Sequence, residues 1–235
     1  MDCLRAFVIS CLTLVCFAAN AATYYVATNG SAGAGSISAP WSFSVAVTNT
    51  IPTGGDTILV RGGVYSTAAG ATPFTLSLNR SGASGASRIT WMNYPQERPI
   101  IWGTVSINGN NLTWQGFEHA QPVQAATRTN LYSLLPGGIN NYGTNNWVLL
   151  NYVHDCGQPG IGSWQSNGWG TKIVGNVIER NGLYDTEFSY NAWRSSGMYL
   201  QNWIGEPLVA HNIVSRQSTT LMKAYTQSEK ADGYK

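Results

Sequence analysis

Charged residues are scarce in this chain of 235 residues. They make up 10% of it, whereas about a quarter is usual, and the formal net charge is only +2. So small a charge gives no basic surface for nucleic acid or for a membrane. Hydrophobic residues nevertheless make up 43% of the chain, which is too many for a disordered protein. We expect a folded protein with a polar, weakly charged surface.

Cysteine is almost absent outside the first 21 residues. Cys3, Cys11 and Cys16 lie in that stretch, and only Cys156 follows it. A single cysteine can form neither an intramolecular disulfide nor a cysteine-based metal site. We therefore expect Cys156 to be a small, packed residue.

The N-terminal 21 residues have the features of an export signal. A positive charge is followed by an apolar run over 6–19, and Ala19-Asn20-Ala21 fits a small-residue cleavage site. The run is too short to span a membrane, and because it continues past Cys11 it argues against a lipoprotein. The sequence predicts a signal peptide at residues 1–21 and one secreted or periplasmic domain at 22–235, with no membrane segment.

Helical periodicity is also lacking. No stretch after residue 22 keeps an apolar stripe at helical spacing for three turns. Residues 40–49 predict one short helix, with Pro40 near its start, that could cap the N-terminal end. The remaining apolar segments are short, rich in Val and Ile, and bounded by Gly, Pro or Asn, which favours strands. We expect such strands at 24–27, 57–61, 88–93, 99–102, 105–107 and 112–117.

The chain does contain a repeated motif, an Asn with an aliphatic residue three positions before it and another two after it. Three copies centre on Asn151, Asn176 and Asn212, with the aliphatic pairs Val148 and Val153, Ile173 and Ile178, and Val209 and Val214. Unequal intervals between like units are typical of a stacked solenoid whose turns carry insertions. Stacked Asn side chains can form a hydrogen-bonded ladder. Asn is also common in ordinary turns, but the matching flanks favour the ladder.

Several segments resemble a known family. GDTILVRGGVY (55–65), NLTWQGFE (111–118), HDCGQPGIG (154–162) and GTKIVGNVIERNG (170–182) are similar to secreted right-handed parallel β-helix proteins, the pectate-lyase-like and chondroitinase-like solenoids. The likeness covers nearly the whole mature chain. It implies an all-β, single-stranded parallel β-helix of three short strands per coil, with an N-terminal capping helix.

The same resemblance implies a polysaccharide partner. In the lyases of this family a base removes the proton beside a uronate carboxylate, and a cation, often calcium, neutralises that carboxylate. Calcium is implied by the resemblance only, because the acidic residues form no dense cluster of ligands, and the residues themselves indicate no cofactor or metal. We favour a lyase over a glycoside hydrolase, which would need two facing carboxylates such as Glu179 with Asp185 or Glu187. A glycan-binding or structural surface solenoid is the alternative.

Stacking of the repeats also groups ionisable residues. In register, His154 lies beside Glu179 and Asp155 beside Arg180, and these four are the candidate base and carboxylate-neutralising residues. The alternative is an ordinary set of surface ion pairs between neighbouring strands. Related sequences often carry a Gly-His-Gly segment where residues 195–199 read SSGMY, so that histidine is not available here.

Aromatic residues gather in two insertions, a Gly-rich one after the first coil and a longer one before Asn212. Tyr and Trp combine an apolar face with a polar group, which suits flat sugar rings, although they can equally pack loops against the solenoid. The candidate sugar-binding residues are Trp164, Trp169, Tyr184, Trp193, Tyr199 and Trp203.

The C-terminal stretch 221–235 looks like the opening of a further coil that is not completed. We expect an incomplete solenoid, with Val209 and Val214 partnered on one side only, and an oligomeric state that the sequence does not define.

Overall fold

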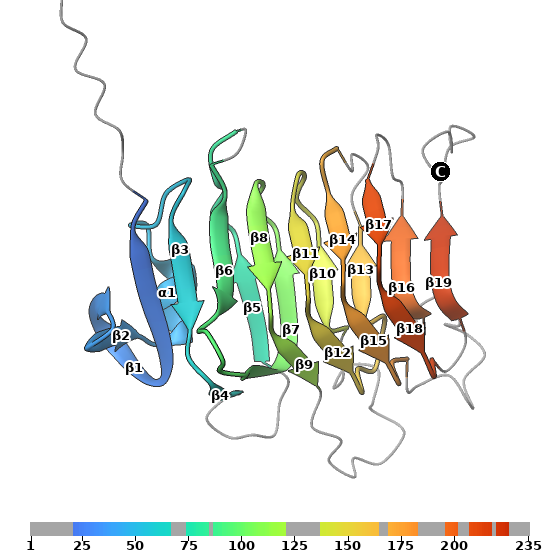
Figure 1. Cartoon of the computed structure of the whole chain (residues 1–235), viewed down its shortest axis with the longest axis horizontal. Helices are drawn as coiled ribbons and strands as arrows, with labels where there is room; N and C mark the ends of the chain where they lie inside the picture. The colour runs from blue at the N-terminus through green and yellow to red at the C-terminus, as the bar shows by residue number, and fades with distance from the viewer. Residues whose placement is uncertain are drawn as a thin grey trace, which may run out of the picture.

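The computed structural model describes residues 21–66, 74–84, 87–120, 137–164, 169–182, 196–201, 207–217 and 220–225 (Figure 1). The expected signal peptide up to residue 20 lies outside these ranges, as do Tyr184, Trp193, Trp203, Asp185 and Glu187. No helix in the described ranges is both long and apolar enough to cross a membrane.

The strands wind into coils that build three faces. The first face holds β1 (Thr23–Ser36), β3 (Thr57–Val60), β6 (Ile89–Asn93), β8 (Leu112–Gln115), β11 (Trp147–Leu149), β14 (Lys172–Val174) and β17 (Leu208–Ala210). The second holds β4 (Gly63–Tyr65), the start of β7 (Pro99–Ile107), β9 (Glu118–Ala120), β12 (Tyr152–His154), β15 (Val177–Glu179) and β18 (Ile213–Ser215).

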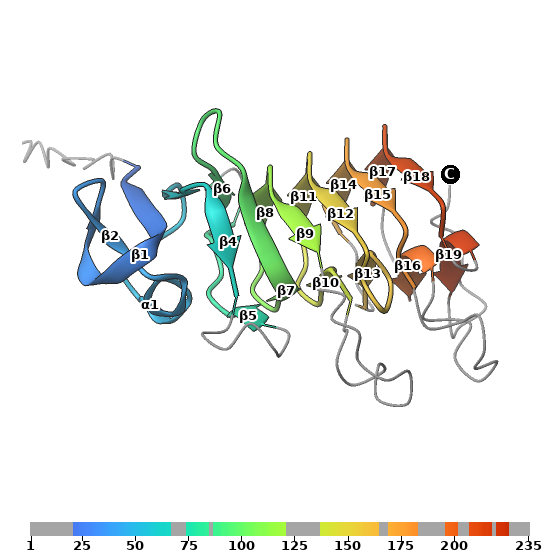
Figure 2. The same cartoon turned by 90° about the horizontal axis from the view of Figure 1, so that it is seen from below.

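The third face holds β5 (Phe74–Leu78), the end of β7, β10 (Ile139–Asn141), β13 (Ile161–Ser163), β16 (Ser196–Gln201) and β19 (Thr220–Tyr225). Each strand pairs in parallel with its equivalents in the neighbouring coils, and Figure 2 shows the second and third faces as separate rows. The predicted single-stranded parallel β-helix is confirmed.

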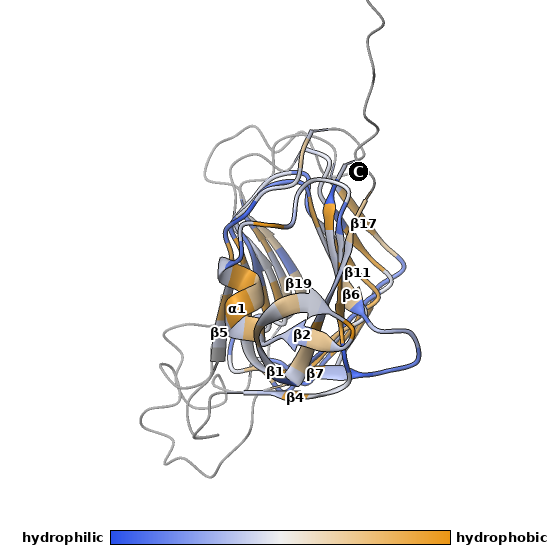
Figure 3. Cartoon of the chain, turned by 90° about the vertical axis from the view of Figure 1, so that its left-hand side faces the viewer, coloured by the Kyte–Doolittle hydropathy of each residue, from blue (hydrophilic) through white to orange (hydrophobic). Residues whose placement is uncertain are grey.

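The N-terminal end carries the predicted cap, with different boundaries. The helix α1 spans Phe43–Thr48 and begins after Ser42, whose hydroxyl caps it by accepting a hydrogen bond from the Val45 amide. Pro40 lies instead in β2 (Ala39–Trp41), which pairs antiparallel with β1. Figure 3 shows α1, β1 and β2 at this end of the coil, where Phe43 packs on Trp91 and Tyr65.

Three further strand predictions differ from the structure. The strand expected at 24–27 is the start of β1, which continues to Ser36. The segments expected at 99–102 and 105–107 form the single strand β7, which continues from the second face to the third. The segment expected at 112–117 ends at Gln115, and a second strand begins at Glu118. Phe117 lies between them, at the corner position that Asn occupies in later coils.

The core consists of the aliphatic columns that the repeat predicts. Val148 pairs in register with Ile173, and Val153 with Ile178, and all four side chains are fully buried. A three-residue strand directs its middle side chain inward and the two flanking ones outward, because side chains alternate along a strand. The lone cysteine, Cys156, is buried in the same core.

The predicted Asn ladder is present at the corner between the first and second faces. The amide nitrogen of Asn151 donates to Oδ1 of Asn176 at 3.0 Å, and that of Asn176 to Oδ1 of Asn212 at 2.9 Å. Asn151 in turn accepts the backbone N–H of Phe117 at 3.0 Å. The ladder thus satisfies buried backbone groups where the strands break, and it holds successive coils in register.

Candidate functional site

The candidate site lies on the outer surface of the second face, across β9, β12 and β15. Tyr152 and His154 flank the buried Val153 and face outward, and Glu179 does the same beside Ile178. His154 is in register with Glu179, as predicted. Three consecutive coils therefore place ionisable side chains next to one another.

The corner that follows these strands holds a second column. Asp155, Arg180 and Arg216 each have a φ of +53°. That conformation costs a non-glycine residue about 1–2 kcal/mol. Leu150 and His211 adopt it at the preceding corner, so the conformation belongs to the coil geometry and is not peculiar to the site. At this corner Asp155 and Arg180 lie side by side and are hydrogen-bonded, and the predicted pairing is present.

His154 is held at both ring nitrogens. Nδ1 lies 2.6 Å from Oδ2 of Asp155, and Nε2 lies 3.0 Å from Oε1 of Glu118. A doubly protonated ring donates to both carboxylates, whereas a neutral ring can donate to only one of them. The side chain of His154 is 13% exposed and its ring stacks on Tyr152 with centroids 4.3 Å apart. The imidazole is therefore closely fixed in position.

Arg180 forms the cationic side of the cluster. Its Nε and Nη2 donate to the two oxygens of Asp155, both at 2.9 Å, and its Nη1 donates to Glu179. Such a two-pronged contact fixes the guanidinium plane. The hydrogen bond with Asp155, followed by that with Tyr152, raises the pKa of Arg180 above its ordinary value. Arg180 is thus a permanent cation.

The carboxylates of the cluster are stabilised in their ionised form. Burial acts to raise the pKa of Asp155, but hydrogen bonds from Arg180 and His154 outweigh it, and the pKa is lowered. The hydroxyl of Tyr152 donates to Oε1 of Glu179 at 2.5 Å, and this bond, together with that from Arg180, lowers the pKa of Glu179. Both acids stay ionised near neutral pH and are weak bases.

Three residues of the cluster were missed by sequence reasoning: Glu118, Tyr152 and Arg98. Glu118 is only 7% exposed and contacts Arg98 as well as His154. It stands in register with Tyr152, one coil before the first Asn. The repeat could have been extended back to Glu118 only if Phe117 had been aligned with the repeated Asn.

The predicted aromatic residues that the structure describes, Trp164, Trp169 and Tyr199, lie outside this cluster. Trp164 follows β13 on the third face, where its Nε1 donates to Oδ1 of Asn140 at 2.8 Å and its ring stacks on Tyr199 with centroids 4.9 Å apart. Tyr199 is 5% exposed, whereas Trp169, before β14, is 57% exposed. The structure thus brings Trp164 and Tyr199 together, and their role in sugar binding stays a prediction.

The cluster does not fit a calcium ion. Glu118, Asp155 and Glu179 already contact the cationic or donor groups of Arg98, Arg180, His154 and Tyr152. Within the described part of the chain, no group of three His, Cys, Asp or Glu side chains is placed to hold a metal.

Solved structures with a similar fold include enzymes and a sugar complex. A GH136 lacto-N-biosidase from Eubacterium ramulus aligns with a TM-score of 0.55 at 16% identity, over 79% of this chain and 41% of that one. XylC in complex with xylose aligns with a TM-score of 0.53 at 12% identity, over 85% of this chain and 60% of that one. Pectate lyase Pel9A aligns with a TM-score of 0.48 at 20% identity, over 83% of this chain and 64% of that one.

This chain spans less than two thirds of the length of those proteins. No protein-family model and no curated protein matches it. Parallel crossover connections are right-handed in nearly all proteins, and the described strands pair in parallel around three faces. The chain therefore has the right-handed parallel β-helix fold.

Proposed function

We propose that this protein acts on a polysaccharide that contains uronate residues, and that the outer cluster of β9, β12 and β15 contacts the acidic sugar. The observation that carries the proposal is the fixed guanidinium of Arg180 beside the imidazole of His154, both outward-facing on neighbouring coils. The similar folds of a lacto-N-biosidase and of XylC with xylose agree with a carbohydrate substrate. The protein is expected to meet that substrate outside the cytoplasm.

The reaction we favour is elimination. A base takes the proton from the carbon beside the uronate carboxylate, the released electron pair forms a C=C bond, the glycosidic C–O bond at the next carbon breaks, and the departing oxygen takes up a proton from solvent. Arg180 would neutralise the carboxylate, which otherwise resists loss of that proton. His154 is the base of this scheme through Nε2, with Asp155 orienting the ring at Nδ1. The step requires the contact between Nε2 and Glu118 to give way to substrate.

Binding without chemistry is the second candidate, and one observation favours it. Both nitrogens of His154 already face carboxylates, and the lowered pKa values of Asp155 and Glu179 make these groups weak bases. A site of this kind can bind an acidic glycan through Arg180 and leave the glycan intact.

Elimination creates unsaturated sugar ends that absorb in the near ultraviolet, so incubation with polygalacturonate distinguishes the two candidates. For a lyase we expect this absorbance to grow with the wild type and to fall at least ~100-fold with Arg180→Ala or His154→Gln, the scale of a lost charge-neutralising or acid–base contribution. Arg61→Ala is the matched control, because Arg61 forms an equivalent pair with Glu97 outside the cluster, and it should retain full activity.

Binding measured on the same variants completes the test. Polygalacturonate binding without absorbance, lost in Arg180→Ala and kept in Arg61→Ala, would identify the non-catalytic candidate. Binding and activity that survive Arg180→Ala would contradict both.

A further inference from the structure

A hollow lies between the end of α1 and the strand β5, on the third face and away from the cluster. It is open to solvent and has a volume of about 550 Å³, which is within the usual size range of small-molecule sites. Most of the residues that line it carry a hydroxyl, amide or guanidinium group, among them Thr48, Asn49, Thr50, Thr75, Ser77 and Arg80. A polar hollow of this size suits a hydroxylated ligand.

Local structure explains why the wall is polar. In β5, Leu76 and Leu78 point into the core and are 1% and 2% exposed, so Thr75 and Ser77 alternate outward. On the other side, Asn49 caps the C-terminus of α1. Its Oδ1 accepts the amide of Ile51 at 2.8 Å, which leaves its two amide hydrogens for another acceptor.

Arg80 is the charged group of this hollow. It is half-buried, and among the described residues it has no hydrogen bond or ion pair through its guanidinium. Arg61, Arg98 and Arg180, in contrast, each contact a carboxylate. An unpaired, partly desolvated guanidinium favours an anionic partner.

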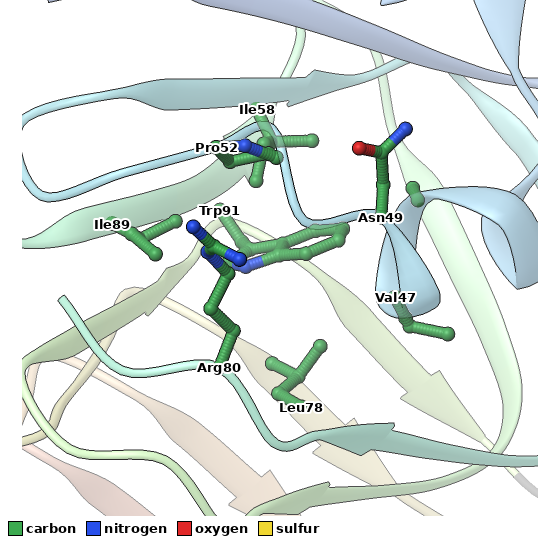
Figure 4. Close-up of a pocket in the computed structure, with 9 residues that line it drawn as sticks. Val47, Asn49, Pro52, Ile58, Leu78, Arg80, Ile89 and Trp91 are labelled. Carbon is green, nitrogen blue, oxygen red and sulfur yellow. The ribbon is translucent and has the colours of Figure 1, made fainter.

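A second, apolar slot adjoins the hollow, and Asn49 and Arg80 line both. The slot holds about 10 Å³, which is room for about one water molecule. Figure 4 shows Arg80 and Asn49 on two sides of it, with the ring of Trp91 between them. Val47 lines both the slot and the hollow, so its methyl groups would report on a ligand bound there.

We propose that this hollow binds one acidic sugar unit of a glycan, with its carboxylate or sulfate on Arg80 and its hydroxyls on the amide of Asn49 and the hydroxyl of Ser77. Guanidinium donors match the planar oxygens of such anions in pairs, and hydroxyl and amide groups match sugar hydroxyls. The hollow lies on the third face, whereas the cluster lies on the second face. It does not depend on the function proposed for Arg180.

The test is a titration of methyl-labelled protein followed by NMR, with trigalacturonate, a sulfated galactose trisaccharide and neutral galactotriose as probes. The Val47 and Leu78 methyl signals should shift with trigalacturonate or with the sulfated sugar, which tells carboxylate from sulfate. Arg80→Ala should weaken this response roughly tenfold or more, the usual scale for a lost charge-assisted hydrogen bond. Arg180→Ala should leave it unchanged, and this separates the hollow from the cluster.

Three outcomes would overturn the proposal. The Val47 signals could stay in place with both acidic probes, or they could shift equally in the wild type and in Arg80→Ala. If neutral galactotriose bound as tightly as the acidic probes, the anionic group would have no role in binding.

Discussion

Acidification from pH 6.5 to pH 4 is expected to lower the free energy of unfolding by about 3 kcal/mol through a single residue, His119. His119 is fully buried inside the coil, and its Nε2 accepts the indole N–H of Trp114 at 2.8 Å. Protonation of Nε2 would place its N–H opposite the indole N–H of Trp114, so that two donors would face each other. Burial, and secondarily the charge of His154, lowers the pKa of His119 to about 3.

The direction of the effect follows from this lowered pKa. Between about pH 6.5 and pH 3 the unfolded chain binds a proton at His119 that the folded chain does not, so stability falls as the pH falls. The slope contributed by one such proton is about 1.4 kcal/mol per pH unit. Well above pH 6.5 the residue is neutral in both states and contributes no slope.

Urea unfolding at a series of pH values measures this slope. His119→Gln is the matched variant, because its side-chain oxygen can still accept the Trp114 N–H but cannot take up a proton in this range. Carboxylates with lowered pKa values, such as Asp155, also lower the free energy of unfolding at more acidic pH, and they do so in both proteins. The difference between the two proteins above pH 4 therefore isolates His119, and parallel curves would refute the assignment.

Replacement of the central Asn of the ladder is expected to cost about 3 kcal/mol of unfolding free energy. Oδ1 of Asn176 accepts both the backbone and side-chain N–H groups of Asn151, at 3.0 Å each. Its amide nitrogen donates to the carbonyl of Val148 at 3.0 Å and to Asn212 at 2.9 Å. Asn176→Ala leaves these buried partners unsatisfied, and each such group is costly.

Thermal unfolding of Asn176→Ala beside Asn108→Ala provides the comparison. Asn108 is exposed and makes one side-chain bond, with Asn79, so its loss should change stability by less than ~1 kcal/mol. Equal melting temperatures for the two variants would show that the ladder does not hold the coils together.

The repeat made the stacked part of this structure predictable. Once Asn151 and Asn176 are aligned, the period fixes the core pair Val153 and Ile178 and the corner pair Asp155 and Arg180, because stacked coils bring equivalent positions together. No comparable signal marks Glu118. Its coil has Phe117 at the position of the repeated Asn, so the sequence motif starts one coil later, at Asn151.

Other features depend on contacts that no local pattern encodes. The bend within β7 lets one strand serve two faces, so Gly103 interrupts no strand although it looks like a boundary in the sequence. Pro40 joins β2 because Trp41 is buried against β1, where it stacks on Tyr24. Trp164 has its place because Gly162 leaves room for the indole. These outcomes are set by tertiary packing, which overrides local propensity.

The most direct test of the proposed site uses the three histidines of the chain. His154 lies in the cluster, His119 lies inside the coil, and His211 lies at the corner between the first and second faces. In protein labelled with ¹⁵N at histidine, titration with trigalacturonate should shift the His154 signals, leave those of His119 and His211 in place, and have no effect in Arg180→Ala. Unchanged His154 signals at saturating ligand, or an equal shift in Arg180→Ala, would contradict the assignment of this cluster as the polysaccharide site.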